Sequence, residues 1–265
     1  MHRSWLATTL LAVLLAPMAA HAQTDLDDRF SISLGGFISD WGTETQLNSD
    51  TLGAGTIIDF EDDLGLDASD TTFRIDGYFR FNDRHRLDFS VFDLSRDASK
   101  AIQEDIQFGD VTFVIDTVID AKTDLSVYKL AYTYSFLRRD RGSLGASIGV
   151  YVADAKFNLS EQNLGQAEQR GITAPLPVFG LRGDYLLNDR FTLRGSAEFF
   201  ALEYHDVDGS ISDFFFSVDY QMTEHTALGL GYNYVSIDAD ASRSDFSGSL
   251  DWRYDGALLF LKFDF

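Results

Sequence analysis

The sequence of 265 residues contains no cysteine, only three prolines and half as many basic as acidic side chains. The absence of cysteine excludes disulfides, thiolate metal sites and thiol nucleophiles. Lys and Arg number 21 against 42 for Asp and Glu, which gives a net charge of −21 at pH 7. No basic stripe is present to neutralise phosphates, so we expect no nucleic acid among the partners.

A long apolar run occurs only at the N-terminus. His2-Arg3 precedes an apolar stretch over 6–16, and Ala20-His21-Ala22 then provides the small-x-small pattern that signal peptidase accepts. The stretch is shorter than the ~20 residues of a membrane-spanning helix. We therefore predict a cleaved signal peptide over 1–22 and a single exported domain over 23–265.

Beyond residue 28 apolar residues recur at every second position, which is the period of a β-strand. In 73–81 phenylalanine and isoleucine alternate with Arg74, Asp76 and Arg80, and further segments repeat this pattern. The segments approach the ~9–11 residues that a tilted strand needs to cross a bilayer. Tight connections alternate with long ones along the chain, as in outer-membrane barrels with short periplasmic turns and long external loops.

These features predict an all-β fold, a closed antiparallel up-and-down transmembrane β-barrel of about ten strands, with both termini periplasmic. Twelve and eight strands are the alternatives. The strands are expected at 29–39, 71–82, 85–96, 124–137, 143–157, 174–187, 190–205, 209–221, 226–238 and 252–265. The alternation slips near Val91-Phe92, which predicts a bulge. The strand-like stretch Val111–Ile119 either extends a hairpin above the membrane or belongs to a twelve-strand barrel.

The C-terminus ends in an alternating segment with a terminal phenylalanine. Its characteristic residues are Gly256, Leu259, Leu261, Phe263 and Phe265. This end resembles the assembly signal of Gram-negative outer-membrane β-barrel proteins. The resemblance implies an integral outer-membrane location and recognition by the barrel assembly machinery. The stretches Gly55–Asp67 and Tyr78–Arg86 are similar to a group of uncharacterised small outer-membrane barrels, which implies no particular activity.

Outer-membrane barrels include enzymes, so a catalytic set must be considered. His205 lies at the outer end of a predicted strand beside Glu203 and Asp206, a weak candidate for a nucleophile–base set. A solvated strand end is the alternative interpretation. The sequence has no Gly-x-Ser-x-Gly elbow and no His-Glu-x-x-His pair. We therefore assign no catalytic residue, and the balance favours a protein that is not an enzyme.

The long loop over 40–70 is rich in carboxylates. Its densest cluster consists of Asp59, Glu61, Asp62, Asp63 and Asp67. Hard divalent cations take oxygen ligands of this kind. Three interpretations stay open: a dedicated Ca²⁺ site, loosely bound Ca²⁺ or Mg²⁺ that bridges the loop to lipopolysaccharide phosphates, and a solubilising loop. No other cofactor is expected.

Charged residues also occupy the face opposite to the apolar one, so they should point into the lumen. The candidates are Arg74, Asp76, Arg80, Arg182, Asp184, Arg194 and Glu198. Side chains largely fill the interior of so small a barrel. These charges therefore form either a paired polar core or the lining of a narrow channel for small solutes. Trp41 and Trp252 lie at the outer strand ends and fit an aromatic girdle, although strict alternation points both inward.

The sequence thus predicts an integral outer-membrane barrel that contacts membrane lipid and lipopolysaccharide. We interpret it as a non-enzymatic envelope or surface protein with acidic external loops. A narrow solute channel and a lipid-modifying or proteolytic barrel enzyme are the alternatives.

Overall fold

The computed structural model describes residues 28–48, 53–162, 167–204, 207–242 and 247–265. The predicted signal peptide over 1–22 lies outside this part. Within the described ranges, no helix is long and apolar enough to cross a membrane.

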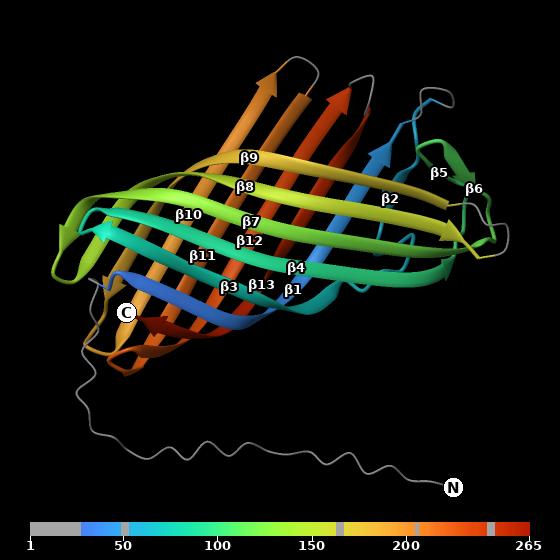
Figure 1. The fold of residues 1–265 in the computed structure, drawn as a ribbon. Coiled ribbons are helices and arrows are strands. Elements are labelled where there is room, and N and C mark those ends of the chain that lie inside the picture. The colour runs from blue at the N-terminus through green and yellow to red at the C-terminus, as the bar shows by residue number, and fades with distance from the viewer. Residues whose placement is uncertain (1–27, 49–52, 163–166, 205–206, 243–246) are drawn as a thin grey trace, which may run out of the picture.

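Long antiparallel strands form a closed wall (Figure 1). They are β1 (Phe30–Leu47), β3 (Ser69–Asn82), β4 (His85–Ala101), β7 (Val118–Arg139), β8 (Gly142–Glu161), β9 (Ala167–Leu186), β10 (Phe191–Tyr204), β11 (Val207–Thr223), β12 (Thr226–Ser242) and β13 (Ser247–Asp264). Each strand pairs with the next one along this order, and β13 pairs with β1 from Asp264–Ser31 to Gly248–Leu47. This closure confirms the prediction of a ten-strand barrel.

Three short strands stand apart from the wall. β2 (Ile57–Asp59) adds to the end of β1, and β5 (Ile106–Phe108) pairs with β6 (Val111–Phe113) as a separate hairpin. The stretch Val111–Ile119 is therefore split between β6 and the start of β7. It extends a hairpin and adds no strand to the wall, so the twelve-strand alternative is wrong.

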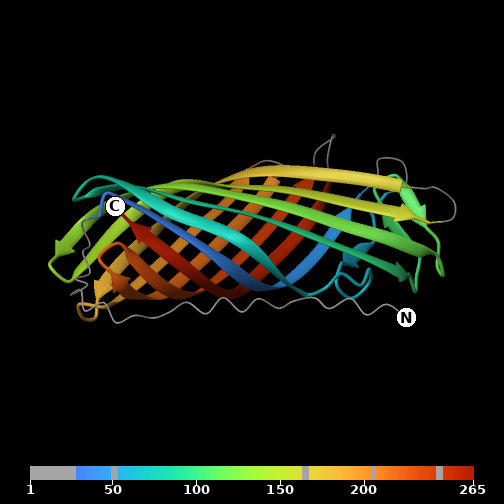
Figure 2. The same ribbon diagram turned by 60° about the horizontal axis from the view of Figure 1, so that its bottom comes forward.

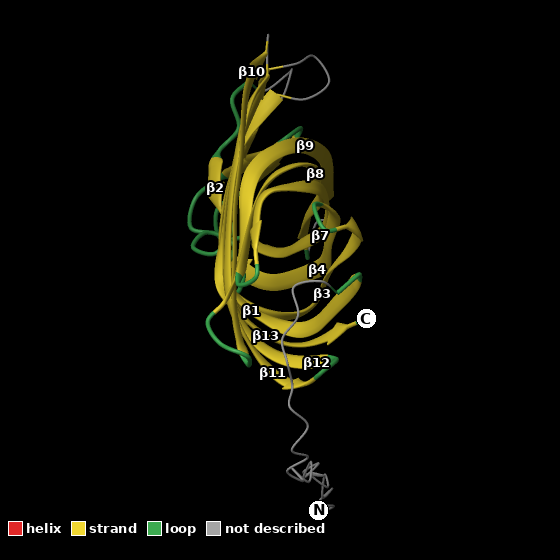
Figure 3. Cartoon of the chain, turned by 90° about the vertical axis from the view of Figure 1, so that its left-hand side faces the viewer, coloured by secondary structure: helices red, strands yellow, loops and turns green. Residues whose placement is uncertain are grey.

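The barrel has two different ends, which we call the turn end and the loop end. Phe30, Phe265 and the tight connections around 83–84, 140–141 and 224–225 lie at the turn end, which faces the viewer in Figure 3. β2, the β5–β6 hairpin and the described parts of the connections from β1 to β3 and from β4 to β7 lie at the loop end, on the right in Figure 2. Several strands reach further towards the loop end than the alternation predicted, because backbone pairing continues where the outer face turns polar.

The outer face carries an apolar belt. Phe73 is 60% exposed, Leu230 60% and Leu259 57%, and many other large apolar side chains around the wall also point outward. Closer to the loop end, the outward positions change to acids such as Asp93 and Asp154. An apolar band bounded by polar residues is the surface that a transmembrane barrel presents to lipid.

The predicted bulge near Val91-Phe92 is absent. β4 keeps its register with both neighbours through these residues. Val91 points outward, whereas Phe92 is 3% exposed and points inward. The physical reason is that the barrel interior itself becomes apolar at this level, so an inward phenylalanine needs no slip in the alternation. The register shifts of the described wall lie near the turns, as between Arg80 and Asn82.

Candidate functional site

The interior divides into two parts, a charged half near the turn end and an apolar half near the loop end. The charged half contains basic and acidic side chains in equal numbers: Arg74, Arg80, Arg86, Lys129, Arg182, Arg194 and Lys262 with Asp76, Asp88, Asp184, Glu198, Asp213, Asp219 and Asp264. All seven residues named from the alternation lie in this set. The strand period places them there, since inward positions recur at every second residue.

Ion pairs connect these side chains across the lumen. Lys129 Nζ pairs with Glu198 and lies 2.6 Å from Asp213 Oδ2. Arg182 lies 3.6 Å from Asp88 and 3.9 Å from Glu198. Since these partners sit on β4, β7, β9, β10 and β11, the pairs join one side of the barrel to the other.

A second chain of contacts marks the border of the charged half. Arg74 Nη2 lies 3.0 Å from Asp76, while Arg74 Nη1 donates to Asn233 Oδ1 at 2.6 Å. Asn233 in turn donates to Asp213 at 2.8 Å. The Arg74 guanidinium also lies over the ring of Phe92, 5.4 Å from its centroid. This arginine therefore belongs to the ion network on one side and to the apolar half on the other.

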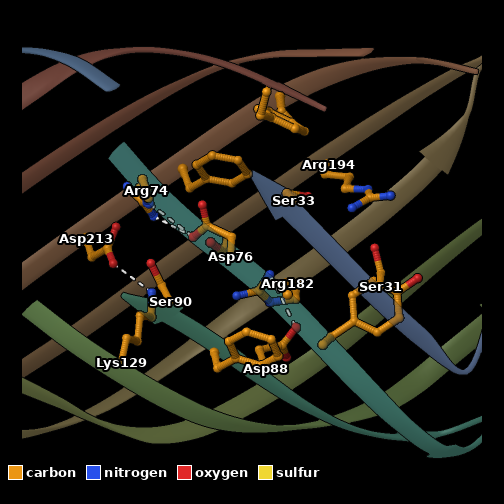
Figure 4. A pocket seen from close by; sticks show the side chains of 17 residues that line it. Ser31, Ser33, Arg74, Asp76, Asp88, Ser90, Lys129, Arg182, Arg194 and Asp213 are labelled. Atoms are coloured by element: carbon orange, nitrogen blue, oxygen red, sulfur yellow. Dashed lines mark hydrogen bonds and ion pairs between the residues drawn. The ribbon is translucent and has the colours of Figure 1, made fainter. Parts of the chain in front are cut away.

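A small polar cavity lies within the charged half (Figure 4). Its volume is about 70 Å³, and its lining includes Ser33, Asp76, Ser90 and Arg194. At about 10–15 Å³ of such volume per water molecule, it has room for a few waters only. Paired side chains thus fill most of the lumen on this side, and this cavity is the space they leave.

The apolar half is a packed core. Phe37, Phe92 and Tyr254 meet edge to face, with ring centroids 5.7–6.0 Å apart. Trp41 and Trp252 are buried here, 6.1 Å apart. Their assignment to an aromatic girdle is therefore wrong, and the alternation that pointed both inward is right. The sequence signal was present, but we had expected the interior to be polar throughout.

Two seams interrupt the wall towards the loop end. The first lies between β3 and β4, whose pairing ends at Arg74 and Phe92 although both strands continue. The segment over 57–67 fills this seam: Phe60, Leu64 and Leu66 are buried in the core. We call it the sealed seam.

Polar contacts hold the sealed seam together. Arg96 Nη1 lies 2.5 Å from Glu61 Oε1, and Arg96 Nη2 donates to Thr43 Oγ1 at 2.9 Å. Lys100 donates to the carbonyl oxygen of Asp62. Gly65 packs against the Lys100 side chain. Its φ angle is +76°, in the left-handed region that glycine adopts without strain.

The predicted acidic cluster lies in the segment that fills this seam. Asp59 Oδ1 accepts hydrogen bonds from the backbone N–H groups of Glu61 and Asp62, and Asp63 Oδ2 accepts one from Asp59. Glu61 is committed to Arg96, and Asp67 gives its carbonyl oxygen to the same arginine. Among the described residues, no three acidic or histidine side chains are grouped so that they could hold a metal ion. A divalent cation at this loop stays a prediction.

The second seam lies between β9 and β10. Their pairing runs from Leu186–Thr192 to Phe179–Phe199 and ends there, although β9 extends back to Ala167 and β10 forward to Tyr204. No described segment pairs with these two extensions on the seam side. We call it the open seam. Sequence reasoning missed it, and the signal for it was the pair Pro175 and Pro177.

The weak catalytic candidates cannot be placed. His205 and Asp206 lie outside the described residues, as does the side chain of Glu203. The described histidines lie at the turn end: His225 is in a turn, and His85 is the first residue of β4, where it contacts the Tyr132 hydroxyl.

The C-terminal residues sit where the barrel closes. Leu259, Leu261 and Phe265 are exposed on the apolar belt, and the Phe265 ring lies 6.0 Å from that of Phe30. Gly256 faces the β1–β13 joint, where an added Cβ would lie 2.1 Å from the Ile38 carbonyl oxygen. The predicted assembly signal thus coincides with the closing strand, while its recognition by the assembly machinery stays a prediction.

Comparisons with known proteins agree on the fold. No protein-family model and no curated protein matches the sequence. The structure is similar to the outer-membrane protease OmpT of Escherichia coli, with 10% identity and a TM-score of 0.57 over 93% of this chain and 100% of that one. Ail of Yersinia pestis and OprG of Pseudomonas aeruginosa each match at 13% identity and a TM-score of 0.35, over 87% and 90% of this chain and 97% of theirs. The likeness to OmpT, at a TM-score of 0.57, speaks for the fold and not for activity. The chain has the fold of a small outer-membrane β-barrel.

Proposed function

We propose that the protein is a non-enzymatic envelope protein of the outer membrane whose lumen does not conduct solutes. The observation that carries this proposal is the charged half, where paired side chains from opposite walls fill the interior. We place the turn end in the periplasm and the loop end outside, because the short turns of outer-membrane barrels face the periplasm.

The loop end supports a role at the cell surface. Outward acids follow the apolar belt on most strands, among them Asp93, Asp124 and Asp154. Ser99 and Gln162 donate hydrogen bonds to the carboxylate of Asp120. These hydrogen bonds lower the pKa of Asp120, so its carboxylate stays ionised at a lower pH than an ordinary aspartate does. Carboxylates and lipopolysaccharide phosphates repel each other unless a cation lies between them. We therefore propose that Ca²⁺ or Mg²⁺ bridges this surface to lipopolysaccharide.

Single-channel recording in planar bilayers tests the sealed lumen. The wild-type barrel should give no conductance steps. The double variant Arg182→Ser/Glu198→Ser removes one cation and one anion, and their remaining partners, Asp88 and Lys129, keep Arg86 and Asp213. This variant enlarges the charged half but leaves the packed apolar half in place, so it should give no conductance steps either; steps from the variant alone would show that the charged side chains, and not the apolar core, close the lumen. Regular steps from the wild type would contradict the proposal.

A narrow solute channel is the second candidate, and the polar cavity of about 70 Å³ favours it. The recording described above decides between the two. The enzyme alternative depends on His205, and His205→Ala in esterase and protease assays tests it: an activity of the wild type that the variant loses would replace the non-enzymatic proposal.

A further inference from the structure

The outer wall is hollowed near the turn end, within the apolar belt. The hollow has a volume of about 410 Å³, and we call it the outer groove. This volume lies in the range of about 300–1,000 Å³ that is typical of small-ligand sites. Its large apolar side chains are those of Leu137, Leu144, Tyr185, Leu193 and Phe216. Tyr185 is 50% and Phe216 51% exposed, so the groove opens towards lipid and not into the lumen.

Two glycines form the floor of the outer groove. Leu144 pairs with Gly183, Gly183 with Gly195, and Gly195 with Phe216, so these outward positions form one row across β8, β9, β10 and β11. Because neighbouring strands lie about 4.8 Å apart, Leu144 and Phe216 stand about 14 Å apart along this row. The two positions between them carry no side chain.

The backbone does not require glycine at either position. Neither Gly183 nor Gly195 has a positive φ, and β9 and β10 keep their register through both. An added Cβ would meet its nearest neighbour at 3.5 Å on Gly183 and 3.6 Å on Gly195, which are ordinary contacts. On Gly180 of the same strand it would lie 2.3 Å from the Ala197 carbonyl oxygen. Glycine weakens a strand and often marks the close approach of a ligand, so the space above this floor calls for an occupant.

Arginines border the outer groove on the side of the turn end. Arg139 pairs with Gly142 and Gly142 with Tyr185, one row nearer to the turn end than the two glycines of the floor. Arg139 and Arg141 both line the groove, and neither forms an ion pair within the described ranges. The turn between β7 and β8, at the left in Figure 1, has three arginines against one aspartate over 138–141.

The order of groups along the outer groove matches that of a phospholipid. Cations stand at the membrane surface and an apolar floor follows towards the middle of the belt, as phosphate is followed by acyl chains in the lipid. A guanidinium binds phosphate through parallel N–H donors, and basic pockets at a membrane surface bind anionic head groups. The turn end is the end that we place in the periplasm, so the lipid would come from the periplasmic leaflet.

We propose that the outer groove holds one anionic phospholipid of the periplasmic leaflet. Arg139 and Arg141 bind its phosphate, and an acyl chain lies over Gly183 and Gly195. The choice of leaflet rests on the proposed orientation of the barrel, and the site itself is independent of whether the lumen conducts.

Native mass spectrometry of the refolded barrel tests this site. The barrel is refolded in detergent with equal amounts of phosphatidylglycerol, which is anionic, and phosphatidylcholine, which has no net charge. We expect one bound phosphatidylglycerol per barrel, in several-fold excess over phosphatidylcholine. Equal binding of the two lipids, or no bound lipid, would overturn the proposal.

Filling the floor should remove the bound lipid. Gly183→Leu/Gly195→Leu places two side chains in the outer groove. Gly36→Leu/Gly42→Leu is the matched control, because these outward glycines of β1 have no atom within 4 Å of an added Cβ. The filled groove should lose phosphatidylglycerol and the control should keep it. If the filled variant does not fold, Gly195→Val alone decides, and an unchanged amount of bound lipid would contradict the proposed site.

Removing the arginines should change the selectivity for the head group. Arg139→Gln/Arg141→Gln should lower the ratio of bound phosphatidylglycerol to phosphatidylcholine by at least about fivefold, the factor expected for one basic residue beside an anionic lipid. Arg29→Gln/Arg84→Gln removes the same charge from the turn end outside the groove, and should leave the ratio unchanged. An equal fall in both variants would mean general attraction of charge and would overturn the assignment of the phosphate to Arg139 and Arg141.

Other occupants give different results in the same spectra. If lipid A displaces phosphatidylglycerol, the outer groove belongs to lipopolysaccharide, and if the wild type is a dimer that Gly183→Leu/Gly195→Leu dissociates, it belongs to a second copy of the chain. Either result would overturn the proposal. Binding in detergent does not depend on orientation. An epitope inserted after Asp140 that antibodies reach on intact cells would overturn the orientation, and with it the leaflet, while the binding site stands.

Discussion

The two seams of the wall solve the same geometric problem in opposite ways. At both, neighbouring strands stop pairing towards the loop end while each continues beside its other neighbour. The sealed seam is filled by 57–67, with Phe60 in the core and Arg96 paired to Glu61. The open seam has prolines in place of donors and no described filling segment. The difference shows that a break in the ladder does not by itself leave a gap: described residues fill the first seam, whereas none of the described segments pairs across the second.

Arg96 should show the largest effect. Its side chain is 2% exposed and Glu61 12%, so Arg96→Met leaves a largely buried carboxylate unpaired and should cost about 3 kcal/mol of unfolding free energy. Arg170 on the open edge is the matched control, because its guanidinium is 41% exposed beside Glu168 and Asp110. Arg170→Met should cost less than about 1 kcal/mol. Urea unfolding of the refolded barrels measures both, and equal costs would remove the distinction between the seams.

Deleting Phe265 tests the joint between β1 and β13. Unlike the two seams, these strands stay paired along their whole length. The ring is 68% exposed, so its loss should lower the unfolding free energy of the refolded barrel by at most about 2 kcal/mol. The yield of inserted protein in cells should fall much further, because the closing strand resembles an assembly signal. Measuring the abundance of the variant in the outer membrane and its urea unfolding after refolding separates the two effects. If the variant inserts at the wild-type level, Phe265 is only a lipid-facing side chain and not part of an assembly signal.

Restoring backbone N–H donors at positions 175 and 177 should let β9 and β10 pair further towards the loop end, so that the open seam becomes shorter. Pro175→Val/Pro177→Val should change the unfolding free energy by no more than about 1 kcal/mol. Hydrogen exchange of the Ala201 amide, which lies opposite position 177 when the register of Phe179 and Phe199 is continued, should slow, since β9 regains donors for a longer ladder with β10. Thr173→Val, on the same face, changes no backbone donor and removes only the hydroxyl that donates to Asp154 Oδ1 at 3.0 Å, so it serves as the control. Unchanged exchange in the double variant would mean that the prolines are not what keeps the strands apart.

The smallest structural effect is expected at the surface of the sealed seam. Asp62→Asn/Asp67→Asn leaves the Glu61–Arg96 pair intact and should change stability by less than about 0.5 kcal/mol. It should nevertheless weaken Ca²⁺-dependent association with lipopolysaccharide, measured by co-sedimentation with and without a chelator. If the protein associates with lipopolysaccharide equally well after chelation and after the substitution, these acids serve only to keep the loop soluble.

The sequence predicted the wall because lipid imposes a sharp contrast on alternate residues, as in 73–81. The same contrast failed at Phe92, where both faces of β4 change character: Asp93 faces out and Leu94 faces in. Alternation reports that a strand exists, but not which face is apolar once the strand has left the membrane. Contacts such as Glu61–Arg96 depend on how distant segments meet, which a linear pattern does not contain. The open seam could have been suspected from two prolines in a strand pattern.

The balanced interior has an electrical consequence. Since the charged half holds seven cations and seven anions, it does not contribute to the net charge of −21. At the turn end, Arg84, Arg138, Arg141 and Arg190 stand beside Asp83, Asp140, Asp189 and Glu224, whereas outward acids such as Asp154 and Asp238 crowd the loop end. The excess negative charge is therefore concentrated at one end of the barrel axis. Neighbouring copies that stand side by side in the same orientation bring these acidic ends together and repel one another there, and salt screens this repulsion.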